Sequence, residues 1–75
     1  MPGPVVYEIR VEGQIDTRWS DWFAGLAISP QAGGNTLLRG PLADQAALHG
    51  VLMKIRDLRL VLISVTRLEP EPRDS

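Results

Sequence analysis

One stretch of the chain, Gly40 to Leu60, decides the fold; it reads GPLADQAALHGVLMKIRDLRL. At 100° per residue its apolar side chains gather on one broad stripe, which is typical of an amphipathic helix. The stripe consists of Ala47, Leu48, Val51, Leu52, Ile55 and Leu58. Pro41 suits the start of a helix but not its interior, and the Asp44 carboxylate is favourable near the amides of a first turn. We therefore predict a helix that begins near Ala43 or Asp44 and packs across a sheet.

The remaining face of this helix carries small residues. Gly50 costs about 1 kcal/mol relative to alanine inside a helix, so its presence indicates a packing reason. The residues that would let another backbone come close are Ala43, Ala46, Gly50 and Met53. His49, the only histidine, lies in a polar strip beside the apolar stripe. We expect it to have a structural role, such as capping a neighbouring turn, rather than to act as a general base or a metal ligand.

Four further segments have the pattern of β-strands. Val5 to Glu12 alternates apolar and polar residues, which predicts a strand with one buried face. Leu26 to Ser29 and Thr36 to Arg39 flank a turn that is rich in Gly and Asn, so they predict a hairpin. Leu60 to Leu68 is the last predicted strand.

The segment around the tryptophans predicts a short helix. Asp16 or Thr17 can cap its start, and Gly25 can end it in a left-handed conformation. Three of the four aromatic residues recur there at spacings of three and four: Trp19, Trp22 and Phe23. We expect them to fill the core between this helix and the sheet, with partner contact and stacking on a flat ligand as alternatives. An irregular loop remains a second interpretation of the segment.

The order strand, short helix, strand, strand, long helix, strand predicts a ferredoxin-like split βαβ fold. Two helices would cover one face of a four-stranded antiparallel sheet in a single α+β domain of residues 1–68. If the tryptophan segment is not helical, a sheet with one helix remains. Residues 69–75, EPEPRDS, lack apolar side chains and predict a disordered tail. We expect Leu60 and Leu62 on the open face of the sheet. A solvent-exposed face does not require two leucines, so their presence favours pairing with another copy through this face.

The composition and net charge of the chain argue against several classes of protein. A chain of 75 residues buries only about 60% of its unfolded surface, and without cysteine it has no disulfides or thiolate metal sites. Association is the remaining source of stability. The net charge of −1 gives no field for nucleic acid or an anionic membrane. No apolar run reaches the length of a membrane span, and Met-Pro-Gly-Pro lacks the features of a secretory signal, so we expect a cytoplasmic protein.

Catalytic signals are weak. No nucleophile with a base, no set of metal ligands and no cofactor loop is visible, so we expect neither an enzyme nor a cofactor. Gly33-Gly34-Asn35 is followed by neither a helix nor a lysine, which favours a hairpin over a phosphate loop. The outward residues of the first strand, Val6, Glu8, Arg10 and Glu12, lack the aromatics of an RNA-binding sheet.

Several blocks of the sequence are similar to those of a known family. They are YEIRV at 7–11, WSDWF at 19–23, GP at 40–41, DQAALHG at 44–50, IRDL at 55–58 and ISV at 63–65. In combination they resemble a family of short bacterial proteins to which no activity is assigned, so the resemblance implies no catalytic residues. The family often has Gly after the IRDL block where this chain has Arg59, a residue that disfavours positive φ.

Together these observations predict a non-catalytic module that forms a homodimer or binds another protein. The alternative is a sensor of an amino-acid-like metabolite, bound near Gly13 and Trp19 at a subunit boundary. The candidate contact residues are Trp19, Trp22, Ala46, His49, Gly50, Met53, Leu60 and Leu62.

Overall fold

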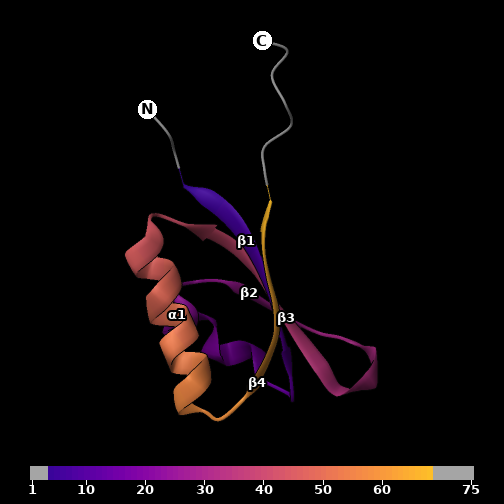
Figure 1. Cartoon of the computed structure of the whole chain (residues 1–75). Helices are drawn as coiled ribbons and strands as arrows, with labels where there is room; N and C mark the ends of the chain where they lie inside the picture. Colours follow the sequence, from indigo (N-terminus) through magenta and orange to yellow (C-terminus); the bar gives the residue numbers. More distant parts are fainter. Residues whose placement is uncertain (1–3, 69–75) are drawn as a thin grey trace, which may run out of the picture.

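The computed structural model describes residues 4–68, which form a four-stranded antiparallel sheet with an α-helix against one face (Figure 1). The elements are β1 (Val5–Glu12), the 3₁₀ helix η1 (Thr17–Phe23), β2 (Ala27–Pro30), the short 3₁₀ turn η2 (Ala32–Gly34), β3 (Asn35–Leu42), α1 (Gln45–Asp57) and β4 (Val61–Leu68). The strand order is β2-β3-β1-β4, so β2 and β4 form the two edges. The predicted tail, residues 69–75, lies outside the described residues.

The prediction of a ferredoxin-like fold with two α-helices is wrong. Within residues 4–68, α1 is the only α-helix, and the tryptophan segment forms the seven-residue 3₁₀ helix η1. Asp16 caps its start, but Ala24 and Gly25 both adopt positive φ, at 59° and 78°, and the Gly25 amide bonds back to the Ser20 carbonyl. The chain therefore leaves the helical conformation before a regular α-helix can form. A sheet with one α-helix results.

β1 follows the predicted alternation over its whole length. Tyr7, Ile9 and Val11 are buried under α1, and the residues between them point to the open face. β3 is longer than predicted and includes Pro41. Proline has no amide hydrogen to donate to a neighbouring strand. It is tolerated at position 41 because β2 pairs with β3 only as far as Arg39, so β2 has no residue there that would accept a hydrogen bond.

The core lies between the sheet, α1 and η1. Its buried apolar members are Tyr7, Ile9, Val11, Ile15, Phe23, Leu26, Ile28, Leu38, Leu42, Leu48, Val51 and Ile55. The Tyr7 hydroxyl accepts a 3.1 Å hydrogen bond from Gln45 Nε2, and the buried Thr36 hydroxyl donates a 2.6 Å bond to the Gly13 carbonyl. The polar groups at the rim of the core are therefore satisfied by side chains and backbone of neighbouring elements.

Both ends of α1 are fixed by local hydrogen bonds. Asp44 Oδ1 accepts a 2.8 Å bond from the Ala47 amide, which confirms the predicted start of the helix. At the other end Arg59 has a φ of 61°, its amide bonds to the Arg56 carbonyl, and the Leu60 amide bonds to the Ile55 carbonyl. This pair of bonds is the Schellman motif, with arginine in the position that favours glycine.

β4 contains a β-bulge that changes which side chains face the helix. Arg10 pairs with Ser64, yet the next residue, Val11, pairs with Leu62, so Ile63 is an extra residue. Directly opposed residues of antiparallel strands share a face. Leu62 therefore lies on the helix side of the sheet, together with the buried Val11.

The expectation that Leu60 and Leu62 lie on the open face is therefore wrong. Leu60 is half-buried against the core, and its side chain lies close to the backbone of Gly13. A strict period of two assigns faces correctly only where pairing is regular, and the bulge at Ile63 interrupts it.

Candidate functional site

A long apolar strand lies at one edge of the sheet. In the part of the chain that the structure describes, β4 pairs with β1 alone, and four of its large apolar side chains are more than one-third exposed. They are Val61 (56%), Leu62 (46%), Ile63 (47%) and Val65 (38%). We call these four residues the β4 edge. An unpaired apolar edge strand is a template for pairing with another chain.

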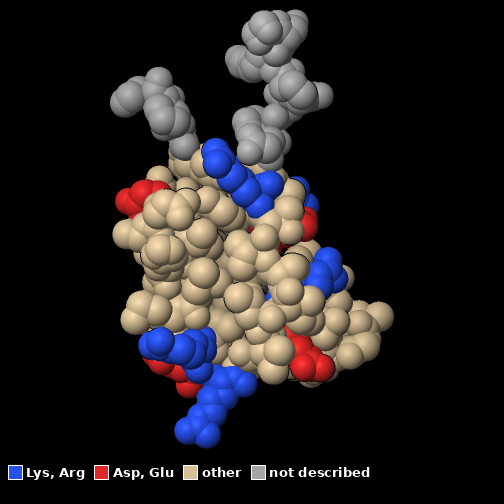
Figure 2. Space-filling model, viewed as in Figure 1, with Lys and Arg blue, Asp and Glu red and all other residues tan. Residues whose placement is uncertain are grey.

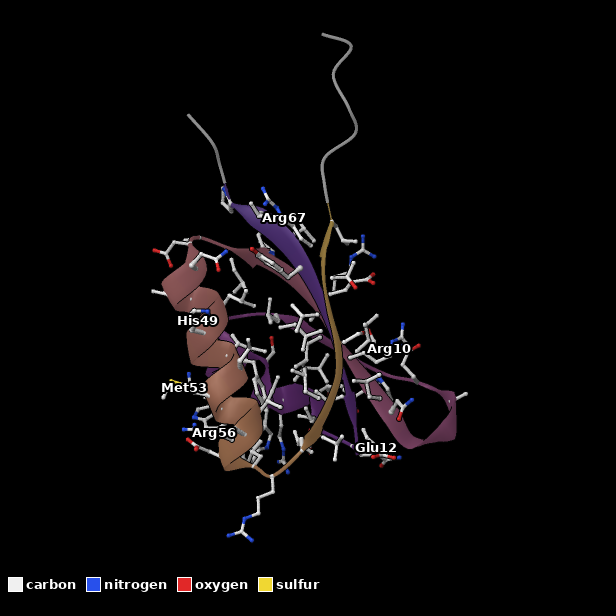
Figure 3. The ribbon with its side chains drawn as sticks, in the orientation of Figure 1. Arg10, Glu12, His49, Met53, Arg56 and Arg67 are labelled. Atoms are coloured by element: carbon white, nitrogen blue, oxygen red, sulfur yellow. The ribbon has the colours of Figure 1, made fainter. Side chains whose placement is uncertain are left out.

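The uncharged surface extends from the β4 edge onto α1. Figure 2 shows a broad area without charged side chains over both elements, with lysine, arginine and acidic residues around its margin. On α1, a shallow hollow is lined by His49, Leu52, Met53 and Arg56. In Figure 3, His49, Met53 and Arg56 follow one another along the helix, whereas Arg10 and Glu12 project from the opposite face of the sheet.

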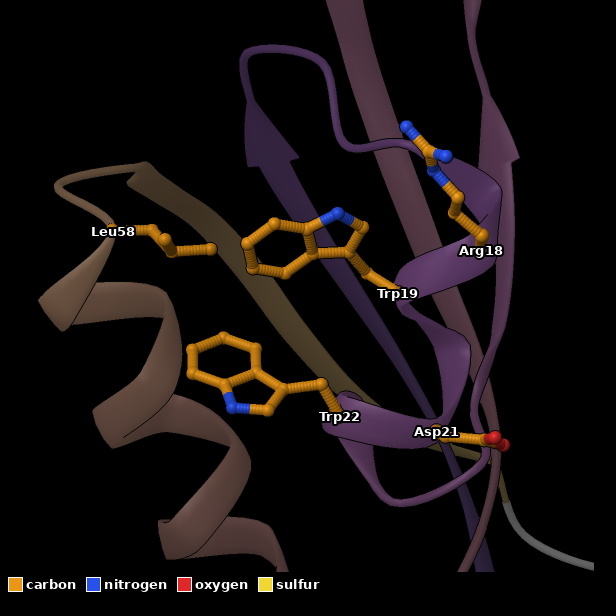
Figure 4. Close-up of a pocket in the computed structure, with 5 residues that line it drawn as sticks. All are labelled: Arg18, Trp19, Asp21, Trp22 and Leu58. Atoms are coloured by element: carbon orange, nitrogen blue, oxygen red, sulfur yellow. The ribbon is translucent and has the colours of Figure 1, made fainter.

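A second apolar surface lies between η1 and the C-terminal end of α1 (Figure 4). It is an open hollow of about 800 Å³, lined by Arg18, Trp19, Asp21, Trp22 and Leu58. The rings of Trp19 and Trp22 meet edge to face, with centroids 5.3 Å apart and an angle of 87° between their planes. Leu58 points toward Trp19 across the hollow. We call Trp19, Trp22 and Leu58 the tryptophan groove.

Lys54 connects the tryptophan groove to α1. Its Nζ donates a 2.7 Å hydrogen bond to the Trp22 carbonyl and lies 5.2 Å from the centroid of the Trp22 ring. The ammonium group thus forms a cation–π contact and a charge-assisted hydrogen bond with the same residue. These contacts hold η1 beside the helix.

The prediction that the three aromatics fill the core is wrong for both tryptophans. Phe23 is fully buried, but Trp19 and Trp22 are 40% and 38% exposed. A 3₁₀ helix has three residues per turn, so side chains three apart are aligned along its axis. Trp19 and Trp22 therefore share one ridge, which faces the groove, while Phe23 lies on another ridge, which faces the core.

The small-residue face of α1 has no neighbour within the described chain. Ala46 and Met53 are exposed, and a Cβ added at Gly50 would meet nothing within 4 Å. The packing reason that we expected for Gly50 is therefore absent from the described residues, and its role in contact with another chain stays a prediction. His49 is exposed, and its side chain makes no hydrogen bond to any of residues 4–68, so it does not cap a turn there.

The ionisable groups serve local structure. Asp16 Oδ1 accepts a 3.0 Å bond from the Arg18 amide, and Asp16 Oδ2 lies 3.1 Å from Arg18 Nε. The amide bond, with the added attraction of the guanidinium, lowers the pKa of the Asp16 carboxyl below its ordinary value. Across residues 4–68, no three His, Asp or Glu side chains gather as a metal-binding group.

Reasoning from the sequence missed three residues of the β4 edge. Val61, Ile63 and Val65 are not among the predicted contact residues, yet each is more than one-third exposed. Their signal was the presence of apolar residues on both faces of one strand. That pattern is typical of a strand in the middle of a layered fold, and here it occurs at an edge.

No helix in the described part of the chain combines the length and apolar character that crossing a membrane requires. Neither the search of curated proteins nor the search of solved structures found a match to this chain. A family profile does match, over residues 6–66, which include all four strands, η1 and α1. The chain therefore belongs to the family described as domain of unknown function DUF8691.

Proposed function

We propose that this protein is a non-catalytic interaction module that works as a homodimer, with the β4 edge of one copy against the β4 edge of the other. The observation that carries the proposal is the exposure of four large apolar side chains on an edge strand of eight residues. Soluble proteins protect such edges with charges, prolines, β-bulges or a covering element. In β4 the bulge at Ile63 is one such device, but only one of its eight side chains, Arg67, is charged.

The size of the chain supports the same proposal. A domain of this length has a small core; its sequence has no cysteine for disulfides, and residues 4–68 contain no group of metal ligands, the two features that stabilise other small domains. Burial of the β4 edge in a dimer would remove apolar surface from water at about 25 cal/mol per Å². Association would thus supply stability that the monomer's core does not.

The bulge gives the proposed pairing a specific register. A two-fold axis perpendicular to the sheet makes opposed residues share a face. Leu62 and Val65 both lie on the helix side, because their partners in β1 are the buried Val11 and Ile9. We propose that Leu62 of each copy lies opposite Val65 of the other, which gathers four apolar side chains beside the two copies of α1.

Light scattering coupled to size-exclusion chromatography tests the proposal. We expect the mass of a dimer for the natural chain and of a monomer for Ile63→Lys. In the proposed register Ile63 lies opposite Ser64 of the other copy, at the centre of the contact. Loss of two symmetry-related isoleucine contacts, about 1.5 kcal/mol each, raises Kd by over a hundredfold. Ser29→Lys is the matched control, since Ser29 is exposed on the other edge strand and should leave the dimer intact. A natural chain that stays monomeric at high micromolar concentration would refute the proposal.

Metabolite sensing beside Trp19 is the second candidate. A smaller hollow, lined by Gln14, Ile15, Asp16, Trp19, Leu58 and Leu60, lies next to the tryptophan groove. We favour the interaction module, because both hollows are open whereas small-molecule sites enclose most of their ligand. Tryptophan emission, titrated with a panel of free amino acids, tests the sensor: an unchanged spectrum with every amino acid would eliminate it.

A further inference from the structure

We propose that the tryptophan groove of each copy receives the segment Glu69-Pro70-Glu71-Pro72 of the other copy. This inference rests on the proposed dimer, because it uses the antiparallel arrangement of the two β4 strands. It assigns a specific occupant to an apolar surface that the dimer contact through β4 leaves open.

The geometry of the pairing brings the two parts together. When Leu62 lies opposite Val65 of the second copy, the residue numbers of opposed positions sum to 127, so Thr66 lies opposite Val61, the first residue of β4. On this path the chain after Leu68 continues past the start of the other copy's β4 toward the turn at Leu58, which lines the tryptophan groove. The four residues from Glu69 to Pro72 span up to about 13 Å when fully extended. Within one copy, β4 runs away from the groove, so the same segment would have to turn back along the strand.

The chemistry of the groove fits a proline-containing segment. Trp19 and Trp22 present two perpendicular indole rings, with the apolar Leu58 across from them. Grooves lined by aromatic side chains bind proline-rich segments, because proline fixes φ and such a segment loses little conformational entropy on binding. Pro70 and Pro72 fix φ at two of the four positions of the segment, which lowers the conformational entropy that binding has to remove.

Charge complementarity supports the same occupant. Arg18 and Asp21 line the groove, and Lys54 and Arg59 lie at the C-terminal end of α1, where Figure 2 shows basic side chains with acidic atoms beside them. Lys54 contacts Trp22 directly. Glu69 and Glu71 bring two negative charges to this region on the proposed path. An acidic, proline-containing segment therefore matches the apolar floor of the groove and the excess of basic over acidic side chains, Arg18, Lys54 and Arg59 against Asp21, around it.

Paramagnetic broadening in the full-length chain tests the contact. The sequence has no cysteine, so Ser75→Cys gives a single site for a nitroxide, and Trp19 and Trp22 give the only two indole N–H signals. Nitroxide-labelled chain at natural nitrogen abundance is mixed with ¹⁵N-labelled natural chain. We expect the indole signals of the natural chain to broaden and to recover when the nitroxide is reduced.

Two double variants of the spin-labelled chain serve as matched comparisons. Glu69→Lys with Glu71→Lys should weaken the contact about tenfold, as expected for two exposed ion pairs. Pro70→Ala with Pro72→Ala should weaken it without a change in charge. Equal broadening with the charge-reversed chain would contradict the charge argument and overturn the proposal.

Light scattering on the same mixture separates this inference from the dimer itself. Dimer mass with sharp indole signals would overturn the groove contact and leave the proposed function standing. Monomer mass with sharp signals would overturn both. Broadening that appears only when label and ¹⁵N are in one chain would place the segment on its own copy and overturn the exchange between copies.

Discussion

The two edges of the sheet differ in length, composition and cover. β2 has four residues, ends at Pro30 and has η1 beside it. β4 has eight residues, no proline, and the four exposed apolar side chains of the β4 edge. Proline and a short length are the means by which proteins prevent pairing at a sheet edge. The contrast indicates that one edge is closed against other chains while the opposite edge is available to them.

The largest effect on the free energy of unfolding is expected from removing the side chain that anchors η1 beside β2. Phe23 is the fully buried anchor of η1, so Phe23→Ala should lower the free energy of unfolding by about 3–5 kcal/mol. Trp22→Ala should cost about half as much, because that ring is already 38% exposed. Urea unfolding at one fixed protein concentration measures both. Equal losses would show that η1 is not anchored through Phe23 and that the cover of β2 is weaker than we infer.

The available edge should make stability depend on concentration. If unfolding separates two copies, each tenfold rise in concentration adds about 1.4 kcal/mol to the apparent free energy of unfolding of the dimer. Thermal unfolding over a hundredfold range of concentration measures this. The dependence should vanish in Ile63→Lys and persist in Ser29→Lys. A melting temperature independent of concentration in the natural chain would remove the functional difference between the edges.

In the turn that leads into β4, Arg59 can be replaced by a residue that makes the folded chain more stable. Arg59 has positive φ, so Arg59→Gly should raise the free energy of unfolding by about 1 kcal/mol. Arg56→Gly is the control, since it places glycine inside α1 and should lower stability by about 1 kcal/mol. Urea unfolding of the two variants should shift in opposite directions. A loss in Arg59→Gly would mean that the arginine side chain makes a contact worth more than the strained backbone.

The smallest effect concerns the cap of η1, beside the closed edge. The pKa of Asp16 is lowered in the folded chain, so its contribution is present above the unfolded pKa and is lost as pH falls through the folded pKa. In Arg18→Ala the amide bond remains but the guanidinium is gone, so the pKa should rise part of the way toward its ordinary value. NMR titration of the Asp16 carboxyl measures the change. An unchanged pKa would assign the whole shift to the backbone amide.

Local patterns predicted the regular elements well. The alternation of Val5 to Glu12 matches β1, and the periodic stripe with Asp44 at its start matches α1. These elements are long and have strong periodicity, so burial of one face determines them. η1 was harder, because seven residues between a cap and two positive-φ positions do not reveal whether the chain takes 3.6 or 3 residues per turn.

The candidate site was less predictable for a related reason. Exposure of the β4 edge depends on strand order, which brings β4 beside β1 with nothing beyond it in the described chain. The bulge at Ile63 depends on hydrogen bonds between strands that are about fifty residues apart in sequence. Neither property is encoded in the local pattern of Val61 to Leu68. The tryptophans were predicted as a cluster, but their exposure follows from the 3₁₀ geometry.

The proline at the end of β2 also limits how large an assembly can grow. A sheet that accepts strands on both sides can add copies indefinitely and become a fibre. Among the strands that the structure describes, the only edge strand of each copy that remains unpaired on one side in the proposed dimer is β2, which is short and ends at Pro30. The proposed self-association would therefore close after two chains, and the exposed apolar strand would not lead to polymers.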